Sequence, residues 1–176
     1  MTKGLQAHGG SKSKNALGEI VHYLKDDLRR SRSIKMKKVY ICAGWFDTEQ
    51  ANIVTLLEHA CADAGLDFFS PRLEVIYKPG MNHQAIVQTN MEAIQDCDFM
   101  LVSTAGKDMG TLFECGYAYA EKIPTVYYYP CDGKFNIMLA ATARAVLQTE
   151  AQLHGYLEYI VKNDLDVDIP FEGEME

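Results

Sequence analysis

The sequence predicts an α/β protein built on a doubly wound parallel sheet. Short apolar segments rich in β-branched and aromatic residues alternate along the chain with segments of helical periodicity. Most of the unusual residues fall in the segments that follow four of the expected strands, "CAGWF", "SPRLEVIYK", "STAGKDMG" and "YPCDGKFN". Because ligands of such sheets bind beyond the carboxyl ends of the strands, this distribution favours a small-molecule site there.

The first half of the body contains two of the expected strands. "KVYICAG" (residues 38–44) is a short apolar run that ends at a glycine and is typical of a buried strand. Asp47 and Gln50 then form a capping-box pattern, which predicts a helix that stops at Gly65. "LDFFS" is the second strand. The loop "RLEVIYKPGMN" follows it and leads into a helix over residues 83–96.

The second half continues the alternation. "DFMLVS" is the third strand, and a loop that holds Asp108 precedes a helix from about Gly110 to Lys122. "PTVYYYP" is the fourth strand, and a short fifth strand lies near "RAVL". Thr149 and Gln152 predict the capped start of a final helix. The tail "DVDIPFEGEME" is acidic, and we expect it to be extended.

Composition limits the class of protein. At 176 residues the chain fits one domain with a real core, and no apolar run approaches the roughly 18–20 residues that span a bilayer. The start, "MTKGLQAHGGSKSK", has no signal-peptide core. Five widely spaced cysteines without a C-x-x-C pair argue against disulfides and zinc. We therefore expect a cytoplasmic protein with no membrane contact, no metal and no cofactor.

The N-terminal residues 1–36 are predicted to form a basic, partly helical extension to the body of the chain, residues 37–176. Residues 1–37 carry nine Lys/Arg and three Asp/Glu, whereas the remainder carries eight and 21. "NALGEIVHYLKDDLRR" has the periodicity of an amphipathic helix. A basic arm can contact nucleic acid, but the acidic body would repel phosphates, so we favour a solvated arm or one that packs within an oligomer.

Two acidic residues near the start of the helix expected at 110–122 are candidates for catalysis. Glu114 lies about one turn into that helix, among small and aromatic residues, and Asp108 lies in the loop before it. A carboxylate that attacks an anomeric carbon, beside a carboxylic acid that serves the leaving group, would suit this pair. Alternatively, Glu114 caps a helix or forms a salt bridge, and Asp108 is a helix N-terminal acid. Spacing alone leaves both interpretations open.

Four further residues have both a structural and a functional interpretation. Tyr40, on the first strand, can hydrogen-bond a carboxylate at the edge of the sheet or simply fill the core. Trp45 and Phe46 can stack on a flat heterocycle or anchor their loop to the next helix. Asn90 shares the apolar face of its helix, where its amide needs a partner. That partner can be backbone at the sheet edge or a ligand hydroxyl.

Several motifs taken together, "VYICAGWF", "DCDFMLV", "DMGTLFECGYAYA", "FNIML" and the late "FEG", resemble the nucleoside 2-deoxyribosyltransferase family over roughly residues 38–173. The resemblance implies a flavodoxin-like, five-stranded sheet. It also implies an enzyme that moves a 2-deoxyribosyl group between nucleobases through a covalent sugar–enzyme ester. The implied partners are deoxynucleosides, free nucleobases and further copies of the chain, in a homo-oligomer with shared active sites.

The resemblance also implies roles for individual residues. Glu114 is the expected nucleophile at C1′, Asp108 is expected to handle protonation at the leaving and entering base, and Tyr40 is expected to orient Glu114. Asn136, with Met138 nearby, falls where the family contacts the 5′-hydroxyl of the sugar from a neighbouring subunit. The other residues expected to contact substrate are Gly44, Trp45, Phe46, Asn90 and Gly110.

The sequence departs from the family at one position, and it is compatible with two alternative functions. Asn90 stands where many relatives carry an aspartate, and an amide can hold a hydroxyl but cannot exchange a proton. If water reaches the sugar ester, the same residues give a nucleoside or nucleotide N-glycoside hydrolase. This sequence matches the phosphoribohydrolase pattern Gly-Gly-x-Gly-Thr-x-x-Glu only at Gly110, Thr111 and Glu114. The sequence therefore lacks the glycine cradle that would bind a phosphate. A module that binds nucleotides without turnover is the second alternative.

Overall fold

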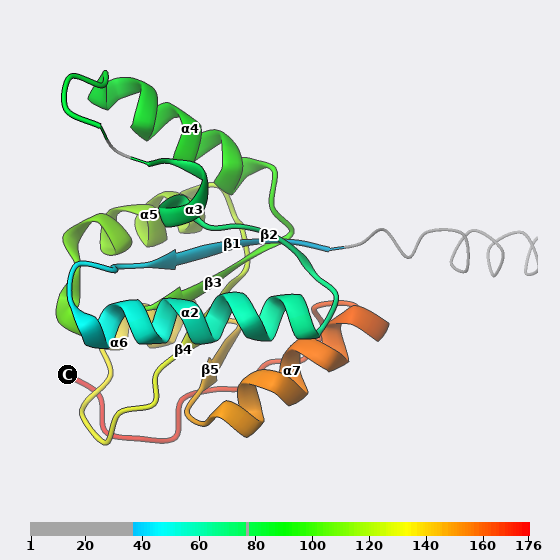
Figure 1. Cartoon of the computed structure of the whole chain (residues 1–176). Helices are drawn as coiled ribbons and strands as arrows, with labels where there is room; N and C mark the ends of the chain where they lie inside the picture. The colour runs from blue at the N-terminus through cyan, green and yellow to red at the C-terminus, as the bar shows by residue number, and fades with distance from the viewer. Residues whose placement is uncertain (1–36, 77) are drawn as a thin grey trace, which may run out of the picture. The chain divides into compact units, whose positions relative to one another are not determined.

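A five-stranded parallel sheet with the strand order β2-β1-β3-β4-β5 organises the computed structural model (Figure 1). The structure describes residues 37–76 and 78–176. This is the flavodoxin-like, doubly wound arrangement that the sequence predicts. Along the chain the elements are β1 (Lys38–Ala43), α2 (Thr48–Asp63), β2 (Asp67–Phe69), α3 (Pro71–Glu74), α4 (His83–Gln95), β3 (Phe99–Ser103), η1 (Ala105–Lys107), α5 (Met109–Ala120), β4 (Thr125–Tyr128), α6 (Ile137–Thr142), β5 (Ala145–Leu147) and α7 (Glu150–Lys162).

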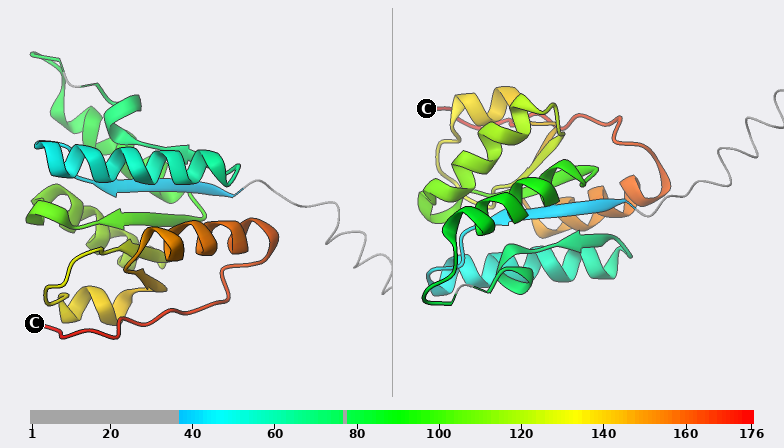
Figure 2. Two further views of the ribbon diagram at one scale, coloured as in Figure 1. Left: turned by 60° about the horizontal axis from the view of Figure 1, so that its bottom comes forward. Right: turned by 90° about the horizontal axis from the view of Figure 1, so that it is seen from above.

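Helices cover both faces of the sheet, and the strands send alternate residues to each face. Helices α2 and α7 lie on one side, and α4, α5 and α6 lie on the other (Figure 2). On β1, Val39 and Ile41 join the core under α2 and α7, whereas Tyr40 and Cys42 join the core under α4 and α5. Successive side chains of a strand point to opposite faces, so this division follows directly from the sequence of β1.

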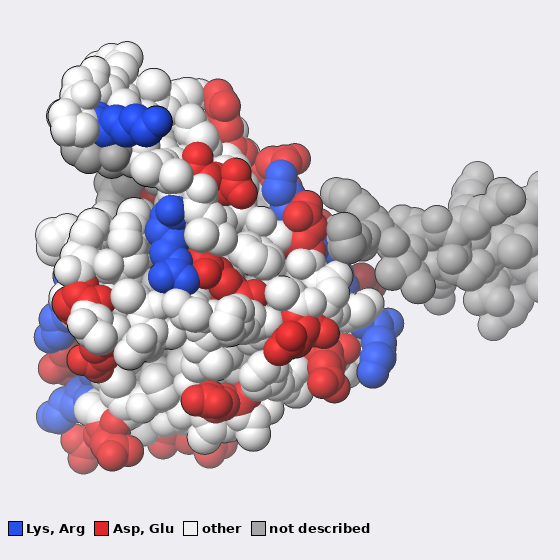
Figure 3. Space-filling model, in the orientation of Figure 1, with Lys and Arg blue, Asp and Glu red and all other residues white. Residues whose placement is uncertain are grey.

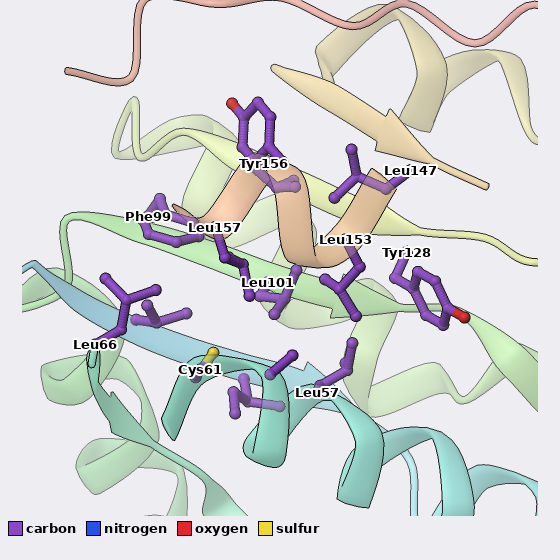
Figure 4. Packing of buried hydrophobic residues seen from close by; sticks show 14 of the residues in the cluster. Leu57, Cys61, Leu66, Phe99, Leu101, Tyr128, Leu147, Leu153, Tyr156 and Leu157 are labelled. Carbon is purple, nitrogen blue, oxygen red and sulfur yellow. The ribbon is translucent and has the colours of Figure 1, made fainter. Parts of the chain in front are cut away.

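The layer under α2 and α7 is held by apolar packing (Figure 4). Leu57 and Cys61 of α2 meet Leu153 and Leu157 of α7 above Leu101 of β3, and all five are fully buried. A fully buried leucine contributes about 2 kcal/mol relative to an exposed one. This layer of the sheet therefore contributes apolar packing to the stability of the fold.

Side-chain caps set the starts of the main helices where the sequence predicts them. Asp47 accepts a hydrogen bond from the backbone N–H of Gln50 at the start of α2 (2.8 Å). Thr149 and Gln152 form the complete capping box of α7. The capping box expected at Asp47 is only half formed, because the side chain of Gln50 turns to the neighbouring loop.

The structure adds two short helices that the sequence analysis assigned to loops or left unassigned. Helix α3 includes the first residues of the segment that the sequence predicts to be a loop. Pro71 stands at the first position of α3 and favours a helical start there. Helix α6 begins directly after Asn136, whose side chain caps it. The helix expected from Asn15, with the whole extension 1–36, lies outside the described residues, so the boundary at residue 36 remains a prediction.

The C-terminal tail is extended, as predicted, and runs along β5 towards α6 (Figure 1). At the edge of the sheet, the Ile169 N–H donates to the Arg144 carbonyl (3.1 Å), and the Ile169 carbonyl accepts from the Val146 N–H (2.8 Å). The ring of Phe171 then packs against Phe135, with centroids 5.3 Å apart. The tail thus covers part of the edge strand, which would otherwise leave backbone groups unpaired.

Acidic side chains are spread over the face shown in Figure 3, with Lys and Arg residues among them. This agrees with the acidic body expected from the sequence. Within residues 37–76 and 78–176, the helices are too short or too polar to cross a membrane.

A buried carboxylate fastens the end of β2 to α2. Glu58 of α2 accepts hydrogen bonds from Ser70 Oγ (2.6 Å) and Arg72 Nε (2.8 Å), and it forms a salt bridge with the Arg72 guanidinium. Burial favours the neutral acid, but the hydrogen bonds from Arg72 and Ser70 outweigh it and lower the pKa of Glu58. These contacts hold the segment that leads from the sheet into α3.

We expect Glu58→Gln to destabilise the fold at neutral pH by about 1 to 3 kcal/mol, because Arg72 loses its charged partner. The folded pKa of Glu58 lies below its unfolded value of about 4.3. The contribution of Glu58 is therefore present above pH 4.3 and is lost as the pH falls through the folded pKa. Urea unfolding should show a gap between wild type and variant at pH 7 that narrows below pH 4.

Asp63→Ala, at an exposed position of the same helix, is the matched control and should change stability by less than about 0.5 kcal/mol. An equal gap for Glu58→Gln at both pH values would contradict a role for the Glu58 charge.

Candidate active site

The carboxylate of Glu114 lies between α5, β1 and α4 and receives hydrogen bonds from three side chains. Tyr40 Oη donates to Oε1 (2.9 Å), and Asn90 Nδ2 donates to the same oxygen (3.1 Å). Cys42 Sγ donates to the other oxygen, Oε2 (3.1 Å). Glu114 itself is partly exposed, whereas Tyr40 and Cys42 are fully buried. The arrangement holds one reachable carboxylate in a fixed orientation.

The period of β1 explains why two of these donors meet Glu114. Tyr40 and Cys42 are two residues apart, so both side chains leave the strand on the face that α4 and α5 cover. Phe69 of β2 is the register neighbour of Tyr40, and the two rings stack with centroids 5.6 Å apart. This contact fixes the phenol ring and leaves its hydroxyl directed at the carboxylate.

Opposing effects act on the charge of Glu114. Burial raises the pKa of Glu114, the hydrogen bonds from Cys42, Tyr40 and Asn90 lower it, and the charge of Asp108 raises it again. The net shift of the pKa is upward. Burial, with the nearby charge of Glu114, also raises the pKa of Tyr40 far above its usual value. Tyr40 therefore remains a protonated donor at any physiological pH.

Asp108 is the N-cap of α5, as the structural interpretation of this residue anticipated. Its Oδ2 accepts hydrogen bonds from the Thr111 backbone N–H (2.7 Å) and hydroxyl (2.9 Å). It also lies close enough to Glu114 for its charge to act on that carboxylate. The two sequence interpretations are thus compatible, because capping through Oδ2 leaves the carboxylate beside Glu114.

Gly44 and Gly110 make room for Asp108. A Cβ atom at Gly44 would lie 3.2 Å from Asp108 Cβ, and a Cβ atom at Gly110 would lie 3.2 Å from Asp108 Oδ2. These distances are tighter than most contacts of a Cβ atom, so a side chain at either glycine would push Asp108 away. Both glycines therefore lie against the candidate acid.

Gln50 is a positioning residue that the sequence analysis assigned only to helix capping. Its Oε1 accepts from the Phe46 backbone N–H (2.9 Å), and its Nε2 donates to the Ala105 carbonyl (3.2 Å). It thus ties the loop after β1 to the loop after β3, which leads to Asp108. Gly106 has a positive φ of 72°, and a Cβ there would lie 2.1 Å from Gln50 Nε2. Gly106 itself is the sequence signal that could have indicated this close approach of the Gln50 side chain to the backbone.

The rings of Trp45 and Phe46 and the amide oxygen of Asn90 are available to contact a ligand. Trp45 and Phe46 stack on each other with centroids 5.1 Å apart, and Phe46 is 72% exposed. Asn90 bonds Glu114 rather than backbone at the sheet edge. Its Oδ1 is buried and has no hydrogen-bond partner in the part of the chain that the structure describes.

Asn136 and Met138 lie at the start of α6, beside a different hollow of the surface. Asn136 Oδ1 accepts from the backbone N–H groups of Met138 and Leu139 (3.0 and 3.4 Å), and Met138 is exposed. Asn136 lines a pocket of about 230 Å³ together with Lys107, Lys134 and Glu176. The hydrogen bonds that Glu114 receives come from Tyr40, Cys42 and Asn90, and Asn136 takes no part in them.

Cys42 is the donor to Glu114 that the sequence analysis missed. Its position two residues after Tyr40 on a predicted strand is the signal that would have placed it on the same face. All five cysteines are free thiols. Within the described ranges, no group of three or more His, Cys, Asp or Glu side chains is placed to hold a metal ion.

Comparisons with known proteins identify the family of the chain and its fold. The family model described as nucleoside 2-deoxyribosyltransferase matches residues 39–165, which is more than half of the chain. No curated protein matches the sequence.

Two solved structures share the fold. A 2-deoxyribosyltransferase from Bacillus psychrosaccharolyticus has a TM-score of 0.66 and 21% identity, over 76% of this chain and 98% of that chain. A 2-deoxyribosyltransferase from Leishmania mexicana has a TM-score of 0.51 and 15% identity, over 73% and 99%. Identities this low speak for the fold alone, whereas the family model carries the assignment. The chain belongs to the nucleoside 2-deoxyribosyltransferase family.

Proposed function

We propose that the protein transfers a 2-deoxyribosyl group from one nucleobase to another by a retaining double displacement, with Glu114 as the nucleophile. The observation that carries this proposal is the set of three hydrogen-bond donors around one partly exposed carboxylate. These three donors, the hydroxyl of Tyr40, the thiol of Cys42 and the amide of Asn90, are neutral groups that orient the carboxylate without neutralising its charge. The family membership supports nucleosides and nucleobases as substrates.

In the first step, an oxygen of Glu114 bonds to C1′ of the deoxynucleoside while the bond from C1′ to the base nitrogen breaks. The bonding electrons leave with the base nitrogen, and Asp108 delivers the proton that neutralises it. In the second step, a nitrogen of the entering base attacks C1′, and the bond from C1′ to Glu114 breaks. The proton of the entering base passes to Asp108, and two inversions give overall retention.

Asp108 is placed to serve the base while it caps α5. Both hydrogen bonds from Thr111 end on Oδ2, so Oδ1 remains for the proton transfer. The negative charge of Asp108 acts on Glu114 in the direction that raises the pKa of Glu114, so the two groups lie within electrostatic reach of each other.

The substrate would rest on the groups around this pair. Trp45 and Phe46 offer exposed rings for a flat base. The orphan Oδ1 of Asn90 can accept a hydrogen bond from a sugar hydroxyl or a base N–H, which would satisfy a buried acceptor. The amide cannot exchange a proton, so proton transfer stays with Asp108.

We also propose a homo-oligomer in which Asn136 and Met138 serve the site of a neighbouring subunit. Four apolar side chains on α5 and α6 are more than half exposed, namely Met109, Phe113, Ile137 and Met138. Exposed apolar groups of this size on neighbouring helices favour a protein interface. Such an interface would carry Asn136, at the start of α6, to a second chain.

Glu114→Ala should lower transfer by roughly a thousandfold or more, because the attacking group is gone. Deoxyinosine is mixed with free adenine, and the products are separated by chromatography. Glu121→Gln, at an exposed position following the same helix, is the control and should keep full activity. A sugar adduct on Glu114, detected by mass spectrometry with a slow substrate, would support the ester directly.

Retained activity in Glu114→Ala would remove Glu114 from the mechanism. Release of free deoxyribose without exchange by the wild type would make the protein a hydrolase. If the wild type forms neither product, the remaining interpretation is a module that binds nucleotides without turnover.

Glu114→Gln should stabilise the fold at neutral pH, because the folded pKa of Glu114 is raised by burial and its ionised form costs stability. The cost is absent below the unfolded pKa of about 4.3 and is complete once the pH has risen through the folded pKa. Thermal unfolding should show a higher Tm for the variant at pH 7.5 and no difference near pH 4. A lower Tm for the variant at pH 7.5 would contradict the raised pKa of Glu114 in the folded protein.

Phe113→Glu should reduce the mass of the particle measured by sedimentation, because a charge would enter the proposed interface. The loss of assembly should be accompanied by a loss of transfer. Glu121→Gln should sediment as the wild type. A wild-type protein that sediments as a monomer would contradict the proposed oligomer.

A further inference from the structure

Cys42 occupies an unusual position for a buried thiol. Its Sγ is fully buried and lies 3.1 Å from Oε2 of Glu114, whereas Tyr40 and Asn90 both reach Oε1. A hydrophobic residue of similar size would pack equally well under α5. The thiol instead gives the second carboxylate oxygen a donor of its own.

We propose that Cys42 is a positioning residue for the reaction, whose S–H group holds Oε2 of Glu114 and keeps the carboxylate ionised and oriented for attack on C1′. The inference rests on the proposed function of Glu114. With donors on both oxygens, the carboxylate plane cannot turn freely. With donors on Oε1 alone, rotation about the last side-chain torsion would stay open.

The thiol remains a donor at the pH values where enzymes work. Burial raises the pKa of Cys42 well above its usual value, and the negative charge of Glu114 acts in the same direction. The other titratable groups nearby are Cys115 and Tyr127, which adjoins Cys115. Cys115 also hydrogen-bonds Cys42, and this contact lowers the pKa of Cys115, so its sulfur is a further acceptor within reach of the S–H group. Burial also raises the pKa of Tyr127, so it carries no negative charge that would compete for the thiol proton.

A weak donor suits a carboxylate whose charge disappears and returns during turnover. When Glu114 forms its ester with the sugar, the oxygen held by Cys42 loses much of its negative charge and accepts less strongly. Cys42 Sγ also lies 3.7 Å from the backbone carbonyl of Thr111, so its hydrogen has a second acceptor. Rotation of one torsion redirects the S–H bond and leaves no strong buried donor unpaired.

The test compares three substitutions of Cys42 in the full-length chain. Cys42→Ala removes the donor, Cys42→Val removes it while filling the space, and Cys42→Ser keeps a donor. Cys61→Ala is the matched control, because Cys61 is an equally buried thiol on the opposite face of the sheet. Two measurements are made between pH 4 and 8: the kcat and KM of base exchange, and the titration of the Glu114 carboxyl by difference infrared spectroscopy, assigned with Glu114→Gln.

Removal of the donor should move the Glu114 titration and the acid limb of kcat to higher pH, because a hydrogen bond to the charged form is lost. The kcat at neutral pH should fall roughly threefold to thirtyfold in Cys42→Ala and Cys42→Val, with KM changed less than about twofold. Cys42→Ser should titrate at the wild-type pH or below it, with most of the activity restored. Cys61→Ala should titrate as the wild type.

An unchanged Glu114 titration in a folded Cys42→Ala or Cys42→Val protein would overturn the inference. It would also be overturned if Cys42→Ser behaved like Cys42→Ala, since the effect would then come from packing, or if Cys61→Ala gave the same shift. If the wild type neither exchanges bases nor releases sugar, the proposed function fails. The infrared titration would still show whether Cys42 holds the Glu114 carboxylate.

Discussion

The site depends on how a partly buried carboxylate is kept charged. Burial raises the pKa of Glu114 and so favours the neutral acid, and the charge of Asp108 works in the same direction. Three neutral donors on β1 and α4 oppose this without cancelling it. A lysine or arginine beside Glu114 would hold the charge more firmly, but it would also make the carboxylate a poorer nucleophile. Neutral donors leave the group ionisable and reactive, which suits covalent attack on a sugar.

The two faces of the sheet divide the tasks of stability and chemistry. Under α2 and α7, fully buried leucines pack on alternate residues of the strands. Under α4 and α5, Tyr40 and Cys42 of β1 donate to Glu114, within a core that also contains apolar strand residues such as Met100 and Val102. The polar contacts at Glu114 therefore need not stabilise the fold, and their balance can be set by what the reaction requires. Gln50 belongs to α2, but its side chain holds together the loops that carry Phe46 and Asp108.

Local sequence signals predict most of the fold and part of the site. Strand periodicity located all five strands, and caps such as Thr149 located the helix starts, because both depend on residues close together in the chain. Glu114, Asp108 and Tyr40 were recognisable as unusual types in their segments. Cys42 and the bond from Asn90 were missed because they depend on which strand and helix lie beside α5 in space. Helix α6 has only six residues, too few for a periodic pattern, and was missed for that reason.

The alternation along β1 has a consequence for how this sequence can vary. Val39, Tyr40, Ile41 and Cys42 serve the two faces in turn, so a single inserted or deleted residue would exchange them. The phenol and the thiol would then enter the leucine layer, and aliphatic side chains would face Glu114. Such a change would remove two donors from Glu114 and disrupt the packed layer under α2 and α7 in one event. Evolution and engineering can therefore alter the chemistry of this strand only by replacing residues at fixed length.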